Sequence, residues 1–409
     1  MKVNNKVIFS WYIYDLANTA FSALFVTFFF PFFVKEFLHG TEFHVGLVIG
    51  ISMLLAAIFV PILGALSDII GKRMPFLIFF TILCVVFTAL VAFVNLPLAL
   101  IFAVIANFSY QSSLIVYDAI LPSIAARKEL GKISGYGTGI GYLGTLLSLG
   151  VAFIVLKFFS TTTQQGYETL SGIKAMFPTT ALFFIIFSIP IFVYVKDKIK
   201  KEIIPLKQGI VRSFKELKNT IKNLQKYRGL VPFLVAAFMY NDAINTVILF
   251  LFLFIREAIS ITVIDFMKLF LLFSTAAAIG SIIYGKVVDK IGPKNSLNIA
   301  LLLWILVTSL LIVKTTFVSI IIVGIMGGVA MGAIWTAARP MLIFLSPEKK
   351  FGEFFGFRGL VGKASGIIGP VLFGFIVTKW NYTYGLTLLL LFFIVAFLIL
   401  QKVPNIKAK

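Results

Sequence analysis

Two acidic residues stand in stretches of the chain that are otherwise almost entirely apolar. Asp15 lies about eight residues into the run 7–34, and Asp242 lies about twelve residues into the run 230–255. An ionisable side chain inside such a run costs several kcal/mol unless it faces a cavity or a partner. Burial favours the neutral form of a carboxylic acid, and a carboxylate attracts an ammonium group. The two acids are therefore candidates for proton exchange or for binding a cationic group of a solute.

The two acids have matching neighbours. Each has an Asn three residues further on, on the same face of a helix, and a Tyr just before it. A structural alternative is that each Asp accepts hydrogen bonds from neighbouring helix ends or from Asn side chains. The candidate coupling or substrate residues of this kind are Tyr14, Asp15, Asn18, Tyr240, Asp242 and Asn245.

Lys363 lies about seven residues inside another apolar run, 356–378. There its ammonium group could meet a substrate carboxylate or Asp242. The alternative is that the side chain extends to the nearer membrane face and leaves only its hydrocarbon stem in the apolar layer.

The composition is that of a polytopic membrane protein. Of 409 residues, 60% are apolar or aromatic and 13% are charged, with a mean hydropathy of +1.04. A soluble domain has about 45–50% apolar and about 25% charged residues, which excludes a cytosolic enzyme and a disordered chain. The one cysteine, Cys84, excludes an internal disulfide, and two histidines are too few for a metal cage. We expect no cofactor and no metal.

Apolar runs separated by turn signals predict an all-α protein of twelve transmembrane helices, since a span needs about 20 apolar residues. They form six, a break, and six, which predicts bundles at 1–196 and 230–409 joined by a linker at 197–229. The runs are 7–34, 45–66, 74–94, 98–121, 134–158, 175–195, 230–255, 264–287, 297–313, 317–345, 356–378 and 382–402.

The positive charge has a topological explanation. With the N-terminus inside, 26 of the 36 Lys and Arg residues fall in cytoplasmic segments and seven outside. Cytoplasmic loops are enriched in these residues, so both termini are predicted to be cytoplasmic, and the net charge of +20 indicates no nucleic-acid partner. The linker stretch 210–226 alternates apolar and basic residues at helical spacing. It predicts an amphipathic helix on the inner leaflet, with a simple tether as the plainer role.

The two halves are related by an internal repeat. The stretch GALSDIIGKR at 64–73 returns as GKVVDKIGPK at 285–294, an offset of 221 residues, and an offset of 227 relates Asp15 to Asp242. The glycines permit a tight turn, and the acid can cap a neighbouring helix in one conformation and release it in another. Topology signalling by the basic residues is the alternative. The candidate gate residues here are Gly64, Asp68, Gly71, Lys72, Arg73, Gly285, Asp289 and Gly292.

Asp118 and Arg339 occupy equivalent positions at the cytoplasmic ends of the fourth and tenth runs, with opposite charges. A salt bridge between them would close an inner gate. Alternatively, Arg339 extends to the lipid headgroups and Asp118 pairs locally with Arg127 or Lys128.

The repeated loop resembles the signature of the major facilitator superfamily. More narrowly, W-x-x-Y-D-x-A-N at 11–18, Y-x-A-x-L-P at 117–122, SGYGTGIGYLG at 134–144 and GEFFGF at 352–357 resemble the vacuole-effluxer branch. The sequence departs from that pattern at position 118, where the branch usually has Asn. The resemblance implies two pseudo-symmetric six-helix bundles, a central cavity lined by helices 1 and 7, and facing helices 4 and 10. It also implies small-solute transport, with amino-acid efflux in fungal vacuolar members. The small residues of 134–144 predict close helix packing rather than a nucleotide site.

Together these features predict a secondary transporter that works by alternating access. Proton coupling and amino acids are the expected choice, in the plasma membrane of a prokaryote. The alternatives left open are a sugar, nucleoside, drug or lipid carrier, a non-transporting receptor or scaffold, sodium coupling or uniport, and either direction of flux. A monomer is compatible with the sequence.

Overall fold

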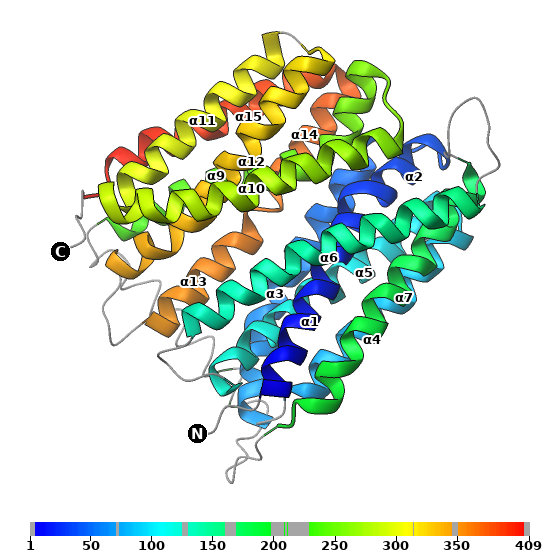
Figure 1. Ribbon diagram of the computed structural model, residues 1–409, viewed down its shortest axis with the longest axis horizontal. Coiled ribbons are helices and arrows are strands. Elements are labelled where there is room, and N and C mark those ends of the chain that lie inside the picture. Colours follow the sequence, from blue (N-terminus) through cyan, green and yellow to red (C-terminus); the bar gives the residue numbers. More distant parts are fainter. Residues whose placement is uncertain are drawn as a thin grey trace. The chain divides into compact units, whose positions relative to one another are not determined.

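The computed structural model describes residues 5–70, 73–124, 130–159, 169–197, 229–313, 315–345 and 351–404, together with residues 208 and 211. Within these ranges nearly every residue is helical (Figure 1). Twelve helical segments in the described part are long and apolar enough to cross a membrane. Many large apolar side chains lie on the outside, such as Phe158 at 82% exposure, as lipid contact requires. The expected all-α fold with twelve spans is confirmed.

The first six spans run from residue 5 to residue 194. The first is made of three consecutive helices, and the third ends in one short 3-10 turn. The elements are α1 (Asn5–Phe21), the π-helix η1 (Ser22–Phe29), α2 (Phe30–Glu36), α3 (Glu42–Ile70), α4 (Met74–Leu90), η2 (Val91–Phe93), α5 (Leu96–Ile124), α6 (Leu130–Phe159) and α7 (Leu170–Tyr194).

The last six spans run from residue 230 to residue 401, and the fifth of them is split into two helices. The elements are α9 (Leu230–Ile259), α10 (Val263–Ile291), α11 (Pro293–Val313), α12 (Phe317–Leu345), α13 (Phe351–Ala364), α14 (Ile368–Lys379) and α15 (Tyr382–Gln401).

The chain divides into two compact units. Unit 1 comprises Met1–Gly40 and Ile51–Leu217, and unit 2 comprises Thr41–Gly50 and Lys218–Lys409. The linker expected at 197–229, including its amphipathic stretch, lies almost wholly outside the described residues. Its boundaries, its helix and the side of the membrane on which the termini lie stay predictions.

The first turns of α3 pack within unit 2. A Cβ at Gly46 would overlap the backbone oxygen of Pro370, and one at Gly50 would overlap the side chain of Val371. Two glycines four residues apart let α3 approach α14 closely, as small residues do between helices in membranes. Beside this crossing the buried carboxylate of Glu42 accepts a hydrogen bond from the hydroxyl of Tyr382 at 3.0 Å.

The first span is widened by its π-helix. Pro31 stands at the start of α2, and a proline ring clashes with the carbonyl of the residue four positions earlier in a regular α-helix. The wider turns of η1 come directly before it, and Thr27 donates to the backbone oxygen of Ser22, five residues back, at 3.3 Å. Proline is thus a sufficient local reason for the distortion.

The eleventh span is broken between α13 and α14 (Figure 1). The backbone N–H groups of Gly366 and Ile367 bond three residues back, to Lys363 and Ala364, which tightens the end of α13. Pro370 follows in the first turn of α14, where its missing N–H costs nothing because no intrahelical acceptor exists there. The break leaves α14 with its own N-terminus inside the span.

Candidate functional site

Asp242 lies in the middle of α9 and is fully buried. Both of its carboxylate oxygens lie 2.9 Å from the backbone nitrogen of Gly369, which donates to them. Gly369 is in the first turn of α14, so the carboxylate caps the helix N-terminus that the break exposes. A carboxylate at this position satisfies a backbone donor and opposes the positive end of the helix dipole.

Glycine at position 369 permits this contact. A Cβ there would lie 2.8 Å from Oδ1 of Asp242 and would also overlap the hydroxyl of Thr246. Thr246 donates to the backbone oxygen of Asp242 at 2.7 Å, which keeps its hydroxyl on the same face of α9. The close approach of α9 and α14 thus depends on the absence of a side chain.

Asp15 has a different environment in unit 1. It is half-buried in α1, and its Oδ1 accepts a hydrogen bond from the side-chain amide of Asn18 at 3.1 Å. The hydroxyl of Thr19 extends this chain to Asn18 at 3.4 Å. The carboxylate faces α6, because Cβ atoms placed on Gly137 and Gly141 would lie 3.4 and 3.5 Å from its Oδ2.

Three of the motif segments meet around α1. Trp11 stacks on Tyr117 of α5 with ring centroids 4.5 Å apart, and each residue donates a hydrogen bond to the other's backbone oxygen at 3.2 Å. Trp11 also covers Gly137 of α6, and Gly144 lies against the backbone of Leu16. Three glycines of 134–144 therefore let α6 pack closely on α1, as expected, while Gly139 has open space around it.

The two tyrosines before the acids are both fully buried. The hydroxyl of Tyr14 shares a hydrogen bond with Thr81 of α4 at 2.8 Å, and its ring lies 5.1 Å from that of Tyr117. The hydroxyl of Tyr240 has no hydrogen-bond partner among the described residues. Tyr14 is held within its bundle, whereas the Tyr240 hydroxyl is left as a buried donor.

The remaining candidates of unit 2 lie near the break. Asn245 is half-buried on α9. The Asp242 carboxylate accepts from Gly369 and the Asp242 backbone oxygen accepts from Thr246, rather than from Asn245. Lys363 lies in the last turn of α13, where a cation is favourable for the helix dipole. The break therefore places Lys363 at a helix end rather than inside a continuous span.

The gate candidates are only partly visible. Gly292 ends α10 with a φ of 83°, a conformation that favours glycine, and Gly285 has open space around its Cβ position. Asp118 is exposed near the end of α5. Two positions lie outside the described residues and four more outside those whose side chains are described: Gly71 and Lys72, then Gly64, Asp68, Asp289 and Arg339. The proposed latch and the Asp118–Arg339 bridge stay predictions.

Asp197 is a capping residue that the sequence interpretation missed. Its carboxylate accepts the backbone N–H of Arg73 at 2.8 Å and that of Met74 at 3.0 Å, so it caps the N-terminus of α4 from the end of the sixth span. The signal in the sequence was an acid directly after the sixth apolar run, since such an acid can cap a helix that begins after a neighbouring loop. Arg73, one of the gate candidates, thus contributes to this cap through its backbone N–H.

A polar stretch of α5 was also missed. Asn107 donates to Ser52 of α3 at 2.5 Å, and its own side-chain oxygen and the hydroxyl of Ser109 have no partner in the described part of the chain. Buried polar groups are normally satisfied, so unpaired ones in a span indicate a place for water or a polar ligand. The signal was NFSYQSS inside an apolar run. The buried polar residues there are Asn107, Ser109, Gln111, Ser112 and Ser113.

The described residues therefore contain a fully buried acid and a half-buried acid in the seventh and first spans, two distorted spans and a buried polar stretch. Among these residues no group of three or more His, Cys, Asp or Glu side chains is placed to hold a metal ion. Ionisable and unpaired polar groups inside membrane spans are candidate sites for a solute or a proton.

The fold is that of known transporters of the major facilitator type. A mutant of the nucleoside transporter NupG superimposes with a TM-score of 0.78 at 12% identity, covering 97% of this chain and 99% of that one. A D-xylose-proton symporter gives 0.76 at 12% identity, with 98% of each chain covered. The protein thus has the fold of a multi-pass membrane transporter of this type.

The family can be stated more narrowly. Residues 41–409 match the family described as vacuole effluxer Atg22 like, and the chain belongs to it. A Bacillus subtilis (strain 168) protein, named as the uncharacterized MFS-type transporter YxiO, is 29% identical over 99% of this chain and 96% of its own length. Autophagy-related protein 22 of Pichia angusta is 22% identical over 65% of this chain and 53% of its own length.

Proposed function

We propose that the protein is a proton-coupled secondary transporter that exports small zwitterionic solutes, with amino acids as the substrate class. Transport proceeds by alternating access, in which Asp15 and Asp242 each exchange a proton or hold the ammonium group of the solute. In this cycle the predicted bundles 1–196 and 230–409 move against each other.

The observation that carries the proposal is the cap between Asp242 and Gly369. An ionised carboxylate accepts hydrogen bonds about twice as strongly as a neutral group, and it also opposes the dipole of α14. Protonation of Asp242 weakens both interactions at the point where the eleventh span is already broken. A change in protonation is thereby linked to a change in the backbone of a span.

Two of the comparisons support export and proton coupling. The family name describes a vacuole effluxer, which favours export, and one solved structure of the same fold is a proton symporter. The half-buried Asp15 supports an ammonium-binding role, because its carboxylate is only partly removed from solvent.

The test is uptake of a labelled amino-acid panel by proteoliposomes, with and without an imposed pH gradient. We expect uptake that rises with the gradient and loses this dependence in Asp242→Asn. The matched control is Asp265→Asn, the same chemical change at an acid of α10 whose side chain is 47% exposed and paired with Lys268. Gradient-driven uptake that is equal in wild type and Asp242→Asn would remove the coupling proposal.

The second candidate is a carrier for sugars or nucleosides. The buried amide and hydroxyl groups of α5 suit a polyhydroxylated solute, and structures of the same fold include a nucleoside transporter and a xylose symporter. The same proteoliposome assay with labelled xylose and uridine distinguishes it. Uptake of either one, with no amino acid transported, would favour this candidate.

The plasma membrane of a prokaryote is the proposed location. Two bacterial relatives, from Bacillus subtilis and Aquifex aeolicus, are matched over 96% and 91% of their own lengths. Alkylation of single cysteines placed at positions 3 and 408 in a Cys84→Ser background, in intact cells and in inverted vesicles, tests the cytoplasmic termini.

A further inference from the structure

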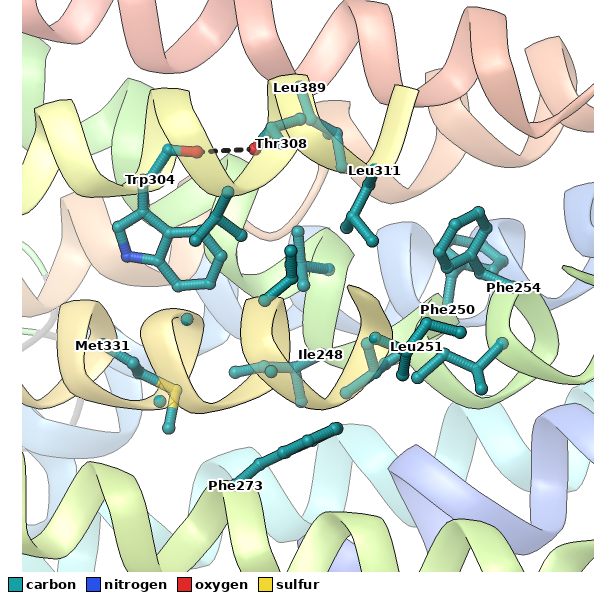
Figure 2. Close-up of a pocket in the computed structure, with 18 of the residues that line it drawn as sticks. Ile248, Phe250, Leu251, Phe254, Phe273, Trp304, Thr308, Leu311, Met331 and Leu389 are labelled. Atoms are coloured by element: carbon teal, nitrogen blue, oxygen red, sulfur yellow. Dashed lines mark hydrogen bonds between the residues drawn. The ribbon is translucent and has the colours of Figure 1, made fainter. Parts of the chain in front are cut away.

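Unit 2 contains a cavity of about 140 Å³ within its own helix bundle (Figure 2). All of its walls come from unit 2, namely from α9, α10, α11, α12, α14 and α15. Leu311 points into it from α11, and Phe273 lies on the opposite side, on α10. The cavity is therefore a feature of one bundle and does not depend on the position of the other.

Glycines form part of one wall of the cavity, beside larger side chains such as Met331. On α12, Gly324, Gly327 and Gly328 face it. Phe273 already fills the space beside Gly324, but a Cβ at Gly327 would meet its nearest neighbours only at 3.8–4.0 Å, on Val307 and Trp304. Space thus remains next to Gly327.

The lining is neutral and aromatic. No charged side chain contributes to it, and six rings do: Phe250, Phe254, Phe270, Phe273, Trp304 and Phe373. The hydroxyl of Thr308 is engaged with the backbone oxygen of Trp304 at 2.8 Å. The indole N–H of Trp304 is buried and has no partner among the described residues. Such a wall offers dispersion and aromatic contacts but nothing that would compensate a buried charge.

We propose that this cavity is a binding site for a small, neutral, mainly hydrocarbon molecule about the size of one aromatic ring. An apolar cavity of about 150 Å³ engineered in another protein stays dry and binds benzene, which sets the size of the ligand. A whole phospholipid is too large, and a zwitterion would lose its hydration without a partner. The site therefore goes beyond the proposed transport function and takes a different class of ligand.

The test uses fluorobenzene and the full-length protein in nanodiscs of phosphatidylcholine with phosphatidylglycerol, followed by fluorine NMR. We expect a saturable resonance that depends on the protein, differs from that of lipid-dissolved fluorobenzene and is displaced by toluene. Leucine, as a zwitterion, should not displace it. Absence of a protein-dependent resonance, or displacement by leucine, would overturn the proposal.

Variants locate the binding. Gly327→Leu fills the space from α12 and should abolish the resonance, and Ile248→Trp fills it from α9 if the first variant does not fold. Gly150→Leu is the control, since Gly150 is an exposed position of α6 with open space around it, and it should retain binding. A resonance that persists in a folded filling variant would contradict this site. If the wild-type protein binds fluorobenzene but takes up no amino acid, the transport proposal alone fails.

Discussion

The acids of the two halves occupy repeat-related positions but have different partners. Asp242 is fully buried and caps a backbone N–H of α14, whereas Asp15 is half-buried and bonds Asn18 on its own helix. Each faces the fifth span of its half. In unit 2 that span is broken into α13 and α14, while in unit 1 it is the continuous helix α6.

The difference lies in the backbone that each acid meets. A continuous helix has no free N–H in its middle, and two glycines of α6, Gly137 and Gly141, lie against the Asp15 carboxylate. A broken helix exposes N–H groups that need an acceptor, and α14 offers one to Asp242. Equivalent acids can therefore serve different purposes: one as a charge that tightens a helix break, the other as a more accessible carboxylate.

The largest expected effect is at Asp242. Asp242→Ala removes the acceptor of a buried N–H, which costs about 1–3 kcal/mol, whereas Asp242→Asn keeps a side-chain oxygen for it. Thermal unfolding in nanodiscs should show a clear loss of stability in the Ala variant and a smaller one in the Asn variant. Proton-driven uptake should be lost in both. Asp15→Ala should lower stability less, and an equal loss at the two acids would break the comparison.

The next effect concerns the glycines that face each acid. Gly369→Ala pushes against Asp242 and Thr246 across a tight helix contact and should cost about 1–3 kcal/mol, as overpacking does. Gly141→Ala meets the hydroxyl of Thr19 at 2.8 Å, the end of a side chain that can turn away. The unfolding temperature should therefore fall less in Gly141→Ala than in Gly369→Ala. Gly139→Ala, with open space around it, is the control.

A smaller effect is expected at the contact between α1 and α5. Tyr117→Phe removes the hydrogen bond to the backbone oxygen of Trp11 but keeps the stacked ring, so it should cost about 1 kcal/mol. The measurement is again the unfolding temperature. Substrate uptake should persist, because the change leaves both acids in place. Abolished uptake with unchanged stability would show that Tyr117 acts on the solute instead.

The smallest effect is expected at Asn18. Asn18→Ala removes one hydrogen bond to a half-buried carboxylate and should cost about 0.5 kcal/mol, since water can replace the amide. Concentration dependence of uptake is the sharper readout, because the change removes a hydrogen bond that orients the Asp15 carboxylate. If Asn18→Ala destabilised the protein as much as Asp242→Ala does, Asp15 would be as dependent on its partner as Asp242.

Much of the fold followed from residue patterning alone. The twelve apolar runs have counterparts in the structure, and so does the close packing expected of several glycines in 134–144. The repeat of 64–73 at 285–294 stays a prediction, because the side chains of 64–72 lie outside the described ones. The break of the eleventh span did not follow, although Gly366 is a residue that commonly ends a helix and Pro370 is one that commonly begins the next. The length and hydropathy of an apolar run predict a span, and a short break inside the run hardly changes either quantity. The π-helix before Pro31 was missed for the same reason.

The sequence by itself determined which residues lie in the membrane spans, because an acid within a run of about twenty apolar residues enters the membrane together with that run. It also indicated the family and the equivalence of Asp15 and Asp242 in the internal repeat. Only the tertiary structure decided what each acid bonds to, since Gly369 is 127 residues from Asp242 along the chain and becomes its partner through the packing of α9 on α14. It also decided that the glycines of α12 leave a cavity, because a void depends on how neighbouring helices fill the same space.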